Sequence, residues 1–376
     1  MINYLDNAAT TFPKPPSVIK ETERCISQYC GNPGRGSHRM ALRAAERLFL
    51  ARTLAAELFS APSAERVVLS LNATYCLNLS ILGIVPEKSH VLISDMEHNS
   101  VLRPVEYLRR NKGVTYDVFS TDGDILENIE ALIKKDTRAL ICTHASNITN
   151  KLLPIREIGE LLARREIYFI VDASQSAGSH PIDMEKCRID ALCMPSHKGL
   201  LGPQGAGLAI FSERVSPKAV ISGGSGAFSR ELEMPAFLPD RLEAGTMPTP
   251  AVAGLCEGIL YVMKRGERDI FEKETKIISK IRNAFFGDRR IFTYSEGEGA
   301  VWLFNIRGVP SQTAAALLGE KGICVRPGLH CAPLAHKALG TPEDGAVRVS
   351  AGPLTEAWQA DHFIRALSGI LRTLPD

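Results

Sequence analysis

The side chains best placed to do chemistry in this sequence are Asp172 and Lys198. Asp172 directly follows the apolar segment Tyr168-Phe169-Ile170-Val171, and Lys198 comes shortly after Ala191-Leu192-Cys193-Met194. Short apolar runs of this kind are typical of buried strands. In open α/β sheets, ligands bind beyond the carboxyl ends of the strands, so both side chains are expected to reach one pocket. A carboxylate that keeps a pyridine nitrogen protonated and an amine that bonds an aldehyde suit pyridoxal 5'-phosphate.

If Asp172 and Lys198 stood alone, the simpler interpretation would be that the Asp caps a loop and the Lys is solvated. Gln175, His197 and the Gly-Pro turn at 199–203 accompany the pair, and this combination favours the functional interpretation. The region resembles the class V, aspartate-aminotransferase-like family of pyridoxal-phosphate enzymes, and within it the cysteine desulfurases of the Suf type. Matching motifs follow in order from Asp6 to Arg348, so the resemblance covers nearly the whole chain.

The alternation of strand and helix patterns up to Phe211 predicts an α/β fold with a mostly parallel, doubly wound sheet. The resemblance implies fold type I of the pyridoxal-phosphate-dependent transferases. It places a large cofactor-binding domain at 16–262 and a smaller α+β domain at 263–376, together with 1–15. A helical run from Ala251 to about Phe286 would connect the two, and Ser311 would cap a helix of the small domain.

A candidate phosphate site lies where the predicted strand Val67–Ser70 is followed by small residues and a helix. Free backbone N–H groups and the helix dipole favour an anion at such a helix start, although many α/β proteins have similar turns. The resemblance assigns the cofactor phosphate to Ala73 and Thr74. Tyr75 stands where many relatives have Glu.

The resemblance assigns further cofactor contacts to His98, Asn147, Gln175 and His197. His98 would stack on the pyridine ring and assist proton transfer, whereas a lone His after a strand is more often structural. Asn147 would bond the ring hydroxyl and contact the substrate, and its alternative is a turn-forming role. Thr246, in the segment Glu-Ala-Gly-Thr, would reach the phosphate of the other subunit's cofactor, which implies a homodimer.

Two departures from the family pattern surround Lys198. Relatives place Ser or Thr three residues before the lysine as a phosphate ligand, but this sequence has Pro195 there. Ser196 is one position later, and the sequence leaves open whether it substitutes. The loop after the lysine also has one residue more than the common Lys-x-x-Gly-Pro.

The segment Arg326-Pro-Gly-Leu-His-Cys-Ala contains the candidate nucleophile, Cys331. A thiolate is a strong nucleophile, and a nearby Arg or His lowers its pKa. Most single cysteines are buried apolar residues instead. Cys324, His330, Cys331 and His336 together would suggest a metal site, but their spacing fits no common zinc pattern. In Suf-type desulfurases the matching cysteine accepts sulfur.

The resemblance also supplies the substrate contacts and a mechanism. Arg348 would hold the substrate carboxylate bidentately, Ala8 and Ala9 would line the pocket, and Arg35 and His38 would lie near its mouth. L-cysteine would displace Lys198 from the cofactor, and Lys198 would take the Cα proton. The Cys331 thiolate would then attack the substrate sulfur, giving a persulfide on the enzyme and alanine.

Three alternatives to a cysteine desulfurase remain open at this point. A selenocysteine lyase would use nearly the same residues on L-selenocysteine. A cysteine or cystine carbon–sulfur lyase, which releases pyruvate, would keep the cofactor site but make Cys331 dispensable. A sulfur-relay protein without catalysis would be colourless, and the presence of Lys198, Asp172 and Arg348 argues against it.

Bulk properties bound the remaining possibilities. A chain of 376 residues suits one large and one smaller domain. Its net charge of +2 gives no basis for binding nucleic acid or an anionic membrane, and no apolar run approaches the ~18 residues that span a bilayer. The amino end lacks a signal-peptide pattern, and nine cysteines without a Cys-x-x-Cys pair favour a reducing cytosol. These properties favour the cytoplasm, whereas the homodimer and a sulfur-acceptor protein as partner are what the resemblance implies.

Overall fold

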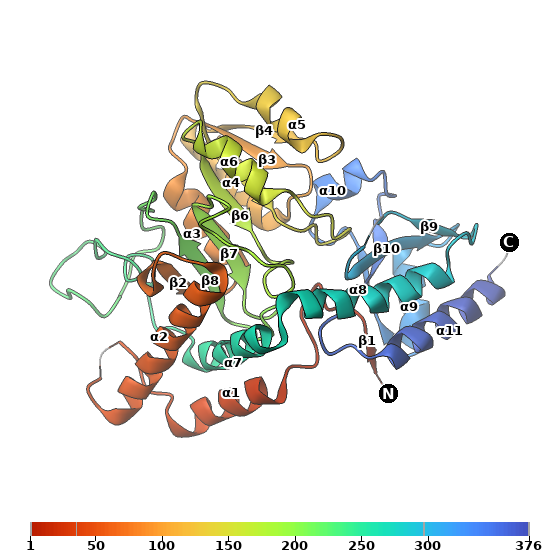
Figure 1. Cartoon of the computed structure of the whole chain (residues 1–376), viewed down its shortest axis with the longest axis horizontal. Coiled ribbons are helices and arrows are strands. Elements are labelled where there is room, and N and C mark those ends of the chain that lie inside the picture. Colours follow the sequence, from red (N-terminus) through yellow and green to blue (C-terminus); the bar gives the residue numbers. More distant parts are fainter. Residues whose placement is uncertain (1, 35, 296–297, 375–376) are drawn as a thin grey trace.

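A central sheet organises the larger of the two lobes in Figure 1. The structure is a computed structural model that describes residues 2–34, 36–295 and 298–374, and in this part of the chain the sheet has seven strands. In order across the sheet they are β2 (Val67–Ser70), β8 (Gly207–Phe211), β7 (Ala191–Pro195), β6 (Tyr168–Asp172), β5 (Thr137–Thr143), β3 (His90–Ser94) and β4 (Thr115–Phe119). Neighbours from β7 to β4 run parallel, whereas β8 is antiparallel to β7 and β2.

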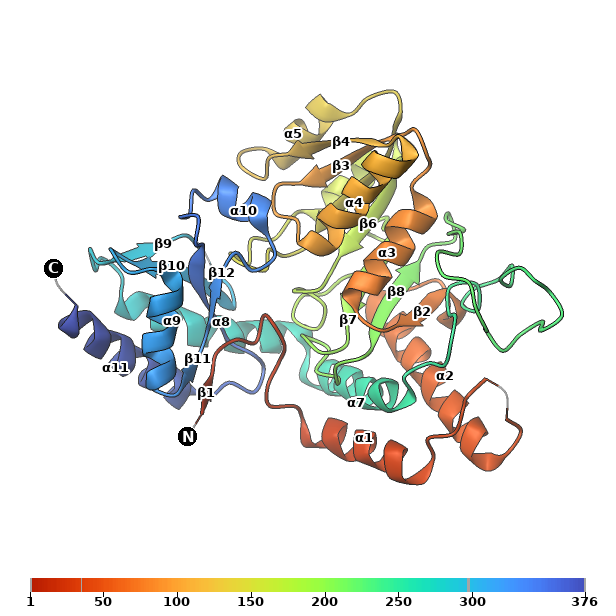
Figure 2. The same cartoon turned by 180° about the vertical axis from the view of Figure 1, so that it is seen from behind.

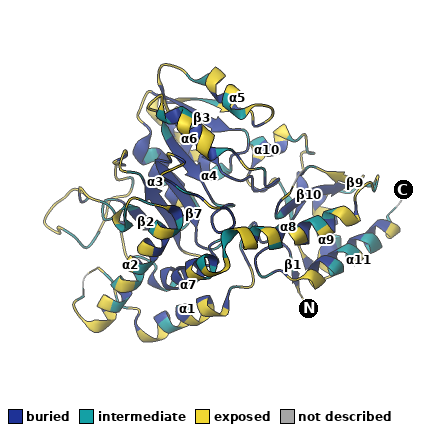
Figure 3. Ribbon diagram, viewed as in Figure 1, coloured by how far each residue is buried: buried dark blue, intermediate teal, exposed yellow. Residues whose placement is uncertain are grey.

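Helices cover both faces of this sheet, as the opposite views in Figures 1 and 2 show. Along β6, Ile170 packs toward the face with α3 and α4, while Phe169 and Val171 pack toward the face with α2, α5, α6 and α7. Because both faces are covered, the inner strands are largely apolar and Figure 3 draws them as buried, whereas the edge strand β4 is partly exposed. The helices are α2 (Arg39–Phe59), α3 (Ala73–Ile84), α4 (Asn99–Lys112), α5 (Ile125–Leu132), α6 (Ile155–Ala163) and α7 (Thr249–Arg265). The predicted mostly parallel, doubly wound α/β sheet is confirmed.

The smaller lobe is built on an antiparallel sheet whose core surrounds Trp302, which stacks between Phe285 and Phe304. Its strands, in spatial order, are β12 (Arg326–Gly328), β13 (Ala346–Ser350), β10 (Val301–Ile306) and β9 (Ile291–Thr293). The helices of this lobe are α8 (Glu267–Ala284), α9 (Ser311–Glu320), α10 (Pro333–Ala338) and α11 (Ala357–Thr373).

The amino-terminal segment belongs structurally to the smaller lobe. Its strand β1 (Asn3–Tyr4) pairs in parallel with β11 (Ile323–Cys324), after which the chain crosses to the larger lobe and forms α1 (Pro16–Gln28). Both ends of the chain therefore lie on the same side of Figure 1. The division of the chain into domains at 262 and 263 stays a prediction, and these positions fall within α7.

Two local expectations were wrong. The helical run from 251 to 286 is two helices, because Gly266 adopts φ 87° and ends α7 one residue before α8 begins. Ser311 does not cap α9, since Pro310 is at the cap and the Ser311 hydroxyl donates to the carbonyl O of Asp344 at 2.8 Å. His38 caps α2 through its Nδ1, which accepts from the Ala41 N–H, and its expected place near the mouth of the site stays a prediction. Among the described residues, no helix is long and apolar enough to cross a membrane.

Candidate active site

A cavity of about 510 Å³ lies where the carboxyl ends of the parallel strands face the smaller lobe. Both lobes and the amino-terminal segment contribute to its lining. It brings together most of the residues singled out from the sequence, namely Ala8, Ala9, Ala73, Thr74, His98, Asn147, Asp172, Gln175, His197, Lys198 and Arg348. Its volume is within the range of small-molecule sites, about 300–1,000 Å³. The roles given to these residues stay predictions.

Asp172 and Gln175 are held rigidly at the end of β6. Asp172 is the last residue of that strand and is 4% exposed, and its Oδ1 accepts from the Ser174 N–H at 2.9 Å. The Gln175 Nε2 donates to the carbonyl O of Ala8 at 3.0 Å, which ties the amino-terminal segment to the cavity wall. A buried carboxylate with a single local bond keeps acceptor capacity for a ligand.

Lys198 lies in this cavity as an amine that is easier to deprotonate than usual. Burial lowers its pKa to about 8, with the Asp172 carboxylate opposing the shift and the Arg348 and Arg326 guanidiniums adding to it. A lysine with a depressed pKa supplies more neutral amine near pH 7 and is a better nucleophile and base.

The extra residue after Lys198 is accommodated away from the cavity. The Leu201 N–H donates to the carbonyl O of Lys198 at 2.8 Å, and Leu201 takes a left-handed conformation with φ 59°. Leu200 and Leu201 are fully buried, and Leu201 packs against Val262 and Ile270 of α7 and α8. The longer loop therefore adds to the packing between the lobes without displacing the lysine from the site.

The structure does not bring Ser196 into the cavity as a substitute for the missing hydroxyl at Pro195. Pro195 lines the cavity, whereas the Ser196 Oγ is buried beside Gly202, where an added Cβ would approach it to 2.1 Å. His197 offers a polar atom instead. Its Nδ1 is buried without a partner among the described residues, and burial together with Lys198 and Lys14 lowers its pKa to about 4.

The amino end of α3 forms a corner of the cavity that suits a phosphate group. Asn72 caps the helix by accepting from the Tyr75 N–H at 3.1 Å, which leaves the Ala73 and Thr74 N–H groups in the first turn. The Thr74 hydroxyl lies 2.8 Å from that of Ser100. The helix dipole and these N–H groups make the corner favourable for an anion.

Ser100 also holds the His98 ring in place, and sequence reasoning missed Ser100. The His98 Nδ1 accepts from the Ser100 N–H at 3.1 Å and lies 2.9 Å from its hydroxyl. Burial lowers the His98 pKa to about 4, although Asp172 opposes the shift. The ring is therefore neutral at pH 7 with its proton on Nε2. A serine at the start of a predicted helix gave no signal of this link.

Arg348 is almost fully buried at the small-lobe side of the cavity. Its two terminal nitrogens donate to the carbonyl O of Asn147 and to the Oδ1 of Asp6, each at 3.0 Å, while its Nε has no partner among the described residues. Arg326 is directly opposite in the β12–β13 register and lines the same cavity. Like charges facing each other are destabilising, so the pair favours an anionic ligand. Sequence reasoning gave Arg326 no role, although it opens the cysteine-containing segment.

Cys331 lies at the edge of this site rather than in its wall. Its thiol is exposed, and its neighbour His330 lines the cavity. Both residues have left-handed backbones, with φ 50° and 56°. Two hydrogen bonds hold the strained turn, from the Asn99 N–H to the Cys331 carbonyl at 2.7 Å and from the Asn147 amide to the His330 carbonyl at 2.9 Å.

His330 and His336 form a pair with each other. The His330 Nδ1 and the His336 Nε2 are 3.1 Å apart, and the other His330 nitrogen lies 2.9 Å from the carbonyl O of Arg326. Burial lowers the pKa values of these imidazoles to about 3 and about 4. Across the described part of the chain, no three His, Cys, Asp or Glu side chains group as metal ligands.

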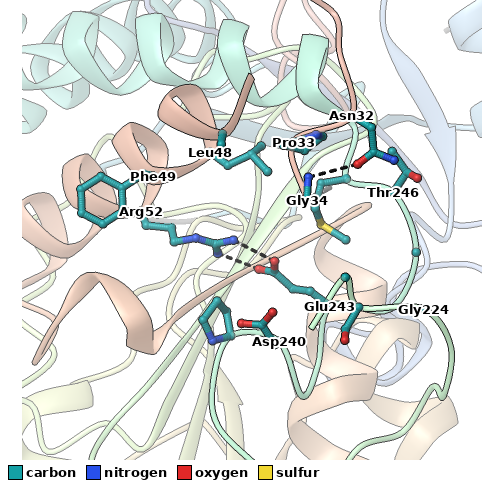
Figure 4. Close-up of a pocket in the computed structure, with 16 residues that line it drawn as sticks. Asn32, Pro33, Gly34, Leu48, Phe49, Arg52, Gly224, Asp240, Glu243 and Thr246 are labelled. Atoms are coloured by element: carbon teal, nitrogen blue, oxygen red, sulfur yellow. Dashed lines mark hydrogen bonds and ion pairs between the residues drawn. The ribbon is translucent and has the colours of Figure 1, made fainter. Parts of the chain in front are cut away.

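Thr246 is not brought to the cavity within one chain. It is exposed and lines a separate hollow of about 400 Å³ with Asn32 and Gly34 (Figure 4). Its segment is anchored by a bidentate ion pair in which Arg52 donates to Glu243 at 2.7 and 2.8 Å. The role predicted for Arg35 falls outside the described residues.

Comparisons with known proteins show the family to which the chain belongs. The model of the aminotransferase class-V family matches residues 3–363. A probable cysteine desulfurase of Methanothermobacter thermautotrophicus is 31% identical, covering 92% of this chain and 89% of the relative. The cysteine desulfurase IscS of Shewanella sediminis is 29% identical, covering 97% and 91%. The apo structure of a cysteine desulfurase from Thermococcus onnurineus NA1 matches with a TM-score of 0.91 and 26% identity, covering 99% and 95%.

Proposed function

Because the chain belongs to the aminotransferase class-V family, we propose that it is a pyridoxal-phosphate-dependent cysteine desulfurase. In this proposal it converts L-cysteine to L-alanine and receives the sulfur on Cys331 as a persulfide. The fold predicted from the sequence, fold type I of the pyridoxal-phosphate transferases, is confirmed by the solved structures that match. The names of the relatives support the proposed reaction, and the arrangement of the cavity supports the roles proposed for its residues.

The residues of the cavity fit pyridoxal 5'-phosphate. The α3 corner with Ala73 and Thr74 suits the phosphate, and His197 lines the same cavity. Asp172 suits a protonated ring nitrogen, and the Lys198 amine suits the aldehyde carbon. When bound, the cofactor supplies an electron sink for the bonds broken at the substrate.

The chain's own groups then divide the work on L-cysteine. Arg348, with Arg326 opposite, binds the substrate carboxylate, and Asn147 and Ala8 border the same space. Lys198 removes the proton from the substrate Cα, and the neutral His98 is placed to move protons nearby. These contacts orient the substrate so that its sulfur faces the edge of the cavity where Cys331 lies.

Cys331 completes the reaction from that edge. Its thiolate attacks the substrate sulfur, so that an S–S bond forms as the C–S bond breaks and the carbon keeps the electron pair and takes a proton. One observation carries the proposal, namely that an exposed thiol follows directly after a residue lining a cavity that also contains Lys198, Asp172 and Arg348. The chemistry of a β-lyase needs no such thiol.

The test is to incubate purified protein with L-cysteine and to measure alanine and pyruvate. Wild type should make alanine, and Cys331→Ala should lose this activity. Cys324→Ala is the matched control, because Cys324 is a second exposed thiol of the smaller lobe and should be dispensable. Pyruvate as the main product, or alanine that survives Cys331→Ala, would show that the protein is not a persulfide-forming desulfurase.

We also propose that the enzyme works as a homodimer in which Thr246 contacts the phosphate of the partner's cofactor. Its exposed position on a firmly anchored segment supports this role. A sulfur-acceptor protein would remove the persulfide from the exposed Cys331. All nine cysteines are free, which supports a reducing compartment such as the cytoplasm.

A further inference from the structure

A second, much smaller cavity of about 40 Å³ adjoins the active site where the two lobes meet the amino-terminal segment. Lys198 and Gln175 line both cavities, so they form part of the wall between them. The bond from Gln175 to Ala8 fixes this wall. The small cavity is therefore in contact with the reactive lysine, although nothing in the proposed reaction uses it.

Glu274 supplies the one carboxyl group among the described residues that line this cavity. It lies on the inward face of α8, between Ile270 and Ile277, and is 7% exposed. Among the described residues it has no hydrogen-bond or ion-pair partner. A buried acid without a partner is costly, so its cavity must solvate it.

Two lysines bear on Glu274: the charge of Lys273 acts on its carboxyl group, and Lys198 lines the same cavity. Lys273, next to it on α8, is turned away, because its Nζ donates to the carbonyl O of Pro353 at 2.9 Å and pairs with Glu356. Lys198 shares the cavity with Glu274. Burial raises the pKa of Glu274 to about 8, with Lys273 opposing the shift, and burial lowers the pKa of Lys198 to about the same value.

The lining of the cavity is suited to water. Asn7, Asn150, Ser179 and Ser350 supply amide and hydroxyl groups from both lobes and from the amino-terminal segment. A polar cavity must offer at least ~10–15 Å³ and a few polar partners to hold a water molecule, and this cavity of about 40 Å³ has room for at least one. One bridging water is enough to transfer a proton between an acid and a base.

We propose that water in this cavity connects the Glu274 carboxyl to the Lys198 amine, and that Glu274 takes up and returns the proton that Lys198 carries. The inference rests on the proposed function, in which Lys198 removes a proton from the substrate. The transfer converts ammonium and carboxylate into amine and carboxylic acid, and no other bond changes. Groups of similar proton affinity exchange protons with little driving force lost. Glu274 does not touch the substrate and acts only through Lys198, so it is a positioning residue for the proton on Lys198.

The first test needs neither cofactor nor turnover. The full-length chain without cofactor is treated with an amine-reactive reagent over a pH series, and modification of Lys198 is followed by peptide mass spectrometry. The Glu274 carboxylate favours the ammonium form of Lys198, so Glu274→Gln should lower the midpoint pH of modification by on the order of half a unit. Glu272→Gln, the same change on the exposed side of α8, should match wild type. Glu274→Met, which fills a similar volume, should match Glu274→Gln.

The second test follows the proton itself during turnover in D₂O. In wild type, Glu274 exchanges the proton on Lys198 with deuterium, so alanine should carry deuterium at Cα. Glu274→Gln should retain at least about twofold more of the original hydrogen there than Glu272→Gln, because exchange is slowed. If Glu274→Gln matches Glu272→Gln in both tests, the inference is refuted. If wild type makes no alanine, the proposed function fails, and Lys198 modification alone decides the role of Glu274.

Discussion

The buried ion pair between Arg52 and Glu243 offers a sharp test of how the fold positions Thr246. Arg52 is on α2 and Glu243 opens the segment that ends at Thr246. The two bonds of the pair measure 2.7 and 2.8 Å, and both side chains are about nine-tenths buried. Each partner has a further bond to β2, since Arg52 donates to the Val67 carbonyl and Glu243 accepts from the Leu69 N–H at 2.6 Å.

Replacing Arg52 by Met leaves a buried carboxylate with only one of its partners. Breaking a buried pair in this way costs about 3–5 kcal/mol, which for a lobe of this size lowers the melting temperature by about 6–20 °C. Arg52→Met combined with Glu243→Gln should recover more than half of this loss, because the unpaired charge is then gone. The affinity for the cofactor should fall in both variants if Thr246 contacts the partner's site.

The measurements are the thermal or urea midpoint of each variant and the equilibrium binding of pyridoxal phosphate. Arg110→Met is the matched control, because Arg110 forms its pair with Glu106 on the exposed surface of α4, where ion pairs contribute at most about 1 kcal/mol. A loss below about 1 kcal/mol for Arg52→Met would refute the reasoning, since the pair would then behave as an exposed one. A double variant no more stable than Arg52→Met would contradict the assignment of the loss to the unpaired carboxylate.

Three further predictions concern the site. Asp172→Asn should lower kcat for alanine formation at least ~100-fold with the protein still folded, because an amide cannot stabilise a protonated ring nitrogen; steady-state rates and the melting temperature separate the two effects. Arg348→Lys should raise KM for L-cysteine by about 10–100-fold, since the bidentate contact with the carboxylate is lost, and a rise in KM below twofold would show that Arg348 does not hold the substrate. Burial raises the pKa of Glu97 to about 8. Above pH ~4.5 the folded state therefore keeps a proton on Glu97 that the unfolded chain has lost. The free energy of unfolding should accordingly fall as pH rises from about 4.5 through 8. Glu97→Gln should reduce this decline in urea midpoints at pH 5 and 8.5, and an unchanged slope would contradict a buried neutral Glu97.

Site residues were predicted best from the sequence where the residue type suits the chemistry and the local pattern also indicates a strand end. Asp172 and Lys198 follow apolar runs that could only be buried strands, and the carboxyl ends of neighbouring parallel strands meet at one edge. Their meeting in one cavity is therefore a consequence of two local patterns and one general rule. The helix start after the strand Val67–Ser70 was also readable from the sequence, but the choice of Ala73 and Thr74 for the phosphate came from the family resemblance.

Contacts that depend on side-chain direction were not predictable. Ser196 carries the expected hydroxyl one position late, but at the end of a strand a shift by one residue turns the side chain to the opposite face, where it meets Gly202. Arg326 reaches the cavity only because β12 pairs with β13 in a register that sets it opposite Arg348. Glu274 is separated from Lys198 by many residues, and no pattern on α8 indicates that its inward face meets a polar cavity.

The position of the amino-terminal segment explains why the site needs both lobes. Asp6 holds Arg348 of β13, and two residues later the Ala8 carbonyl holds Gln175 beyond β6. Thr11 continues the link, since its N–H donates to the carbonyl O of His197 at 3.0 Å. A few consecutive residues thus connect the group proposed to bind the substrate carboxylate with the loop that carries the reactive lysine. A movement of the smaller lobe that shifted Arg348 would therefore also pull on the wall around Lys198, so the proposed binding of the carboxylate would be mechanically coupled to the positioning of the amine.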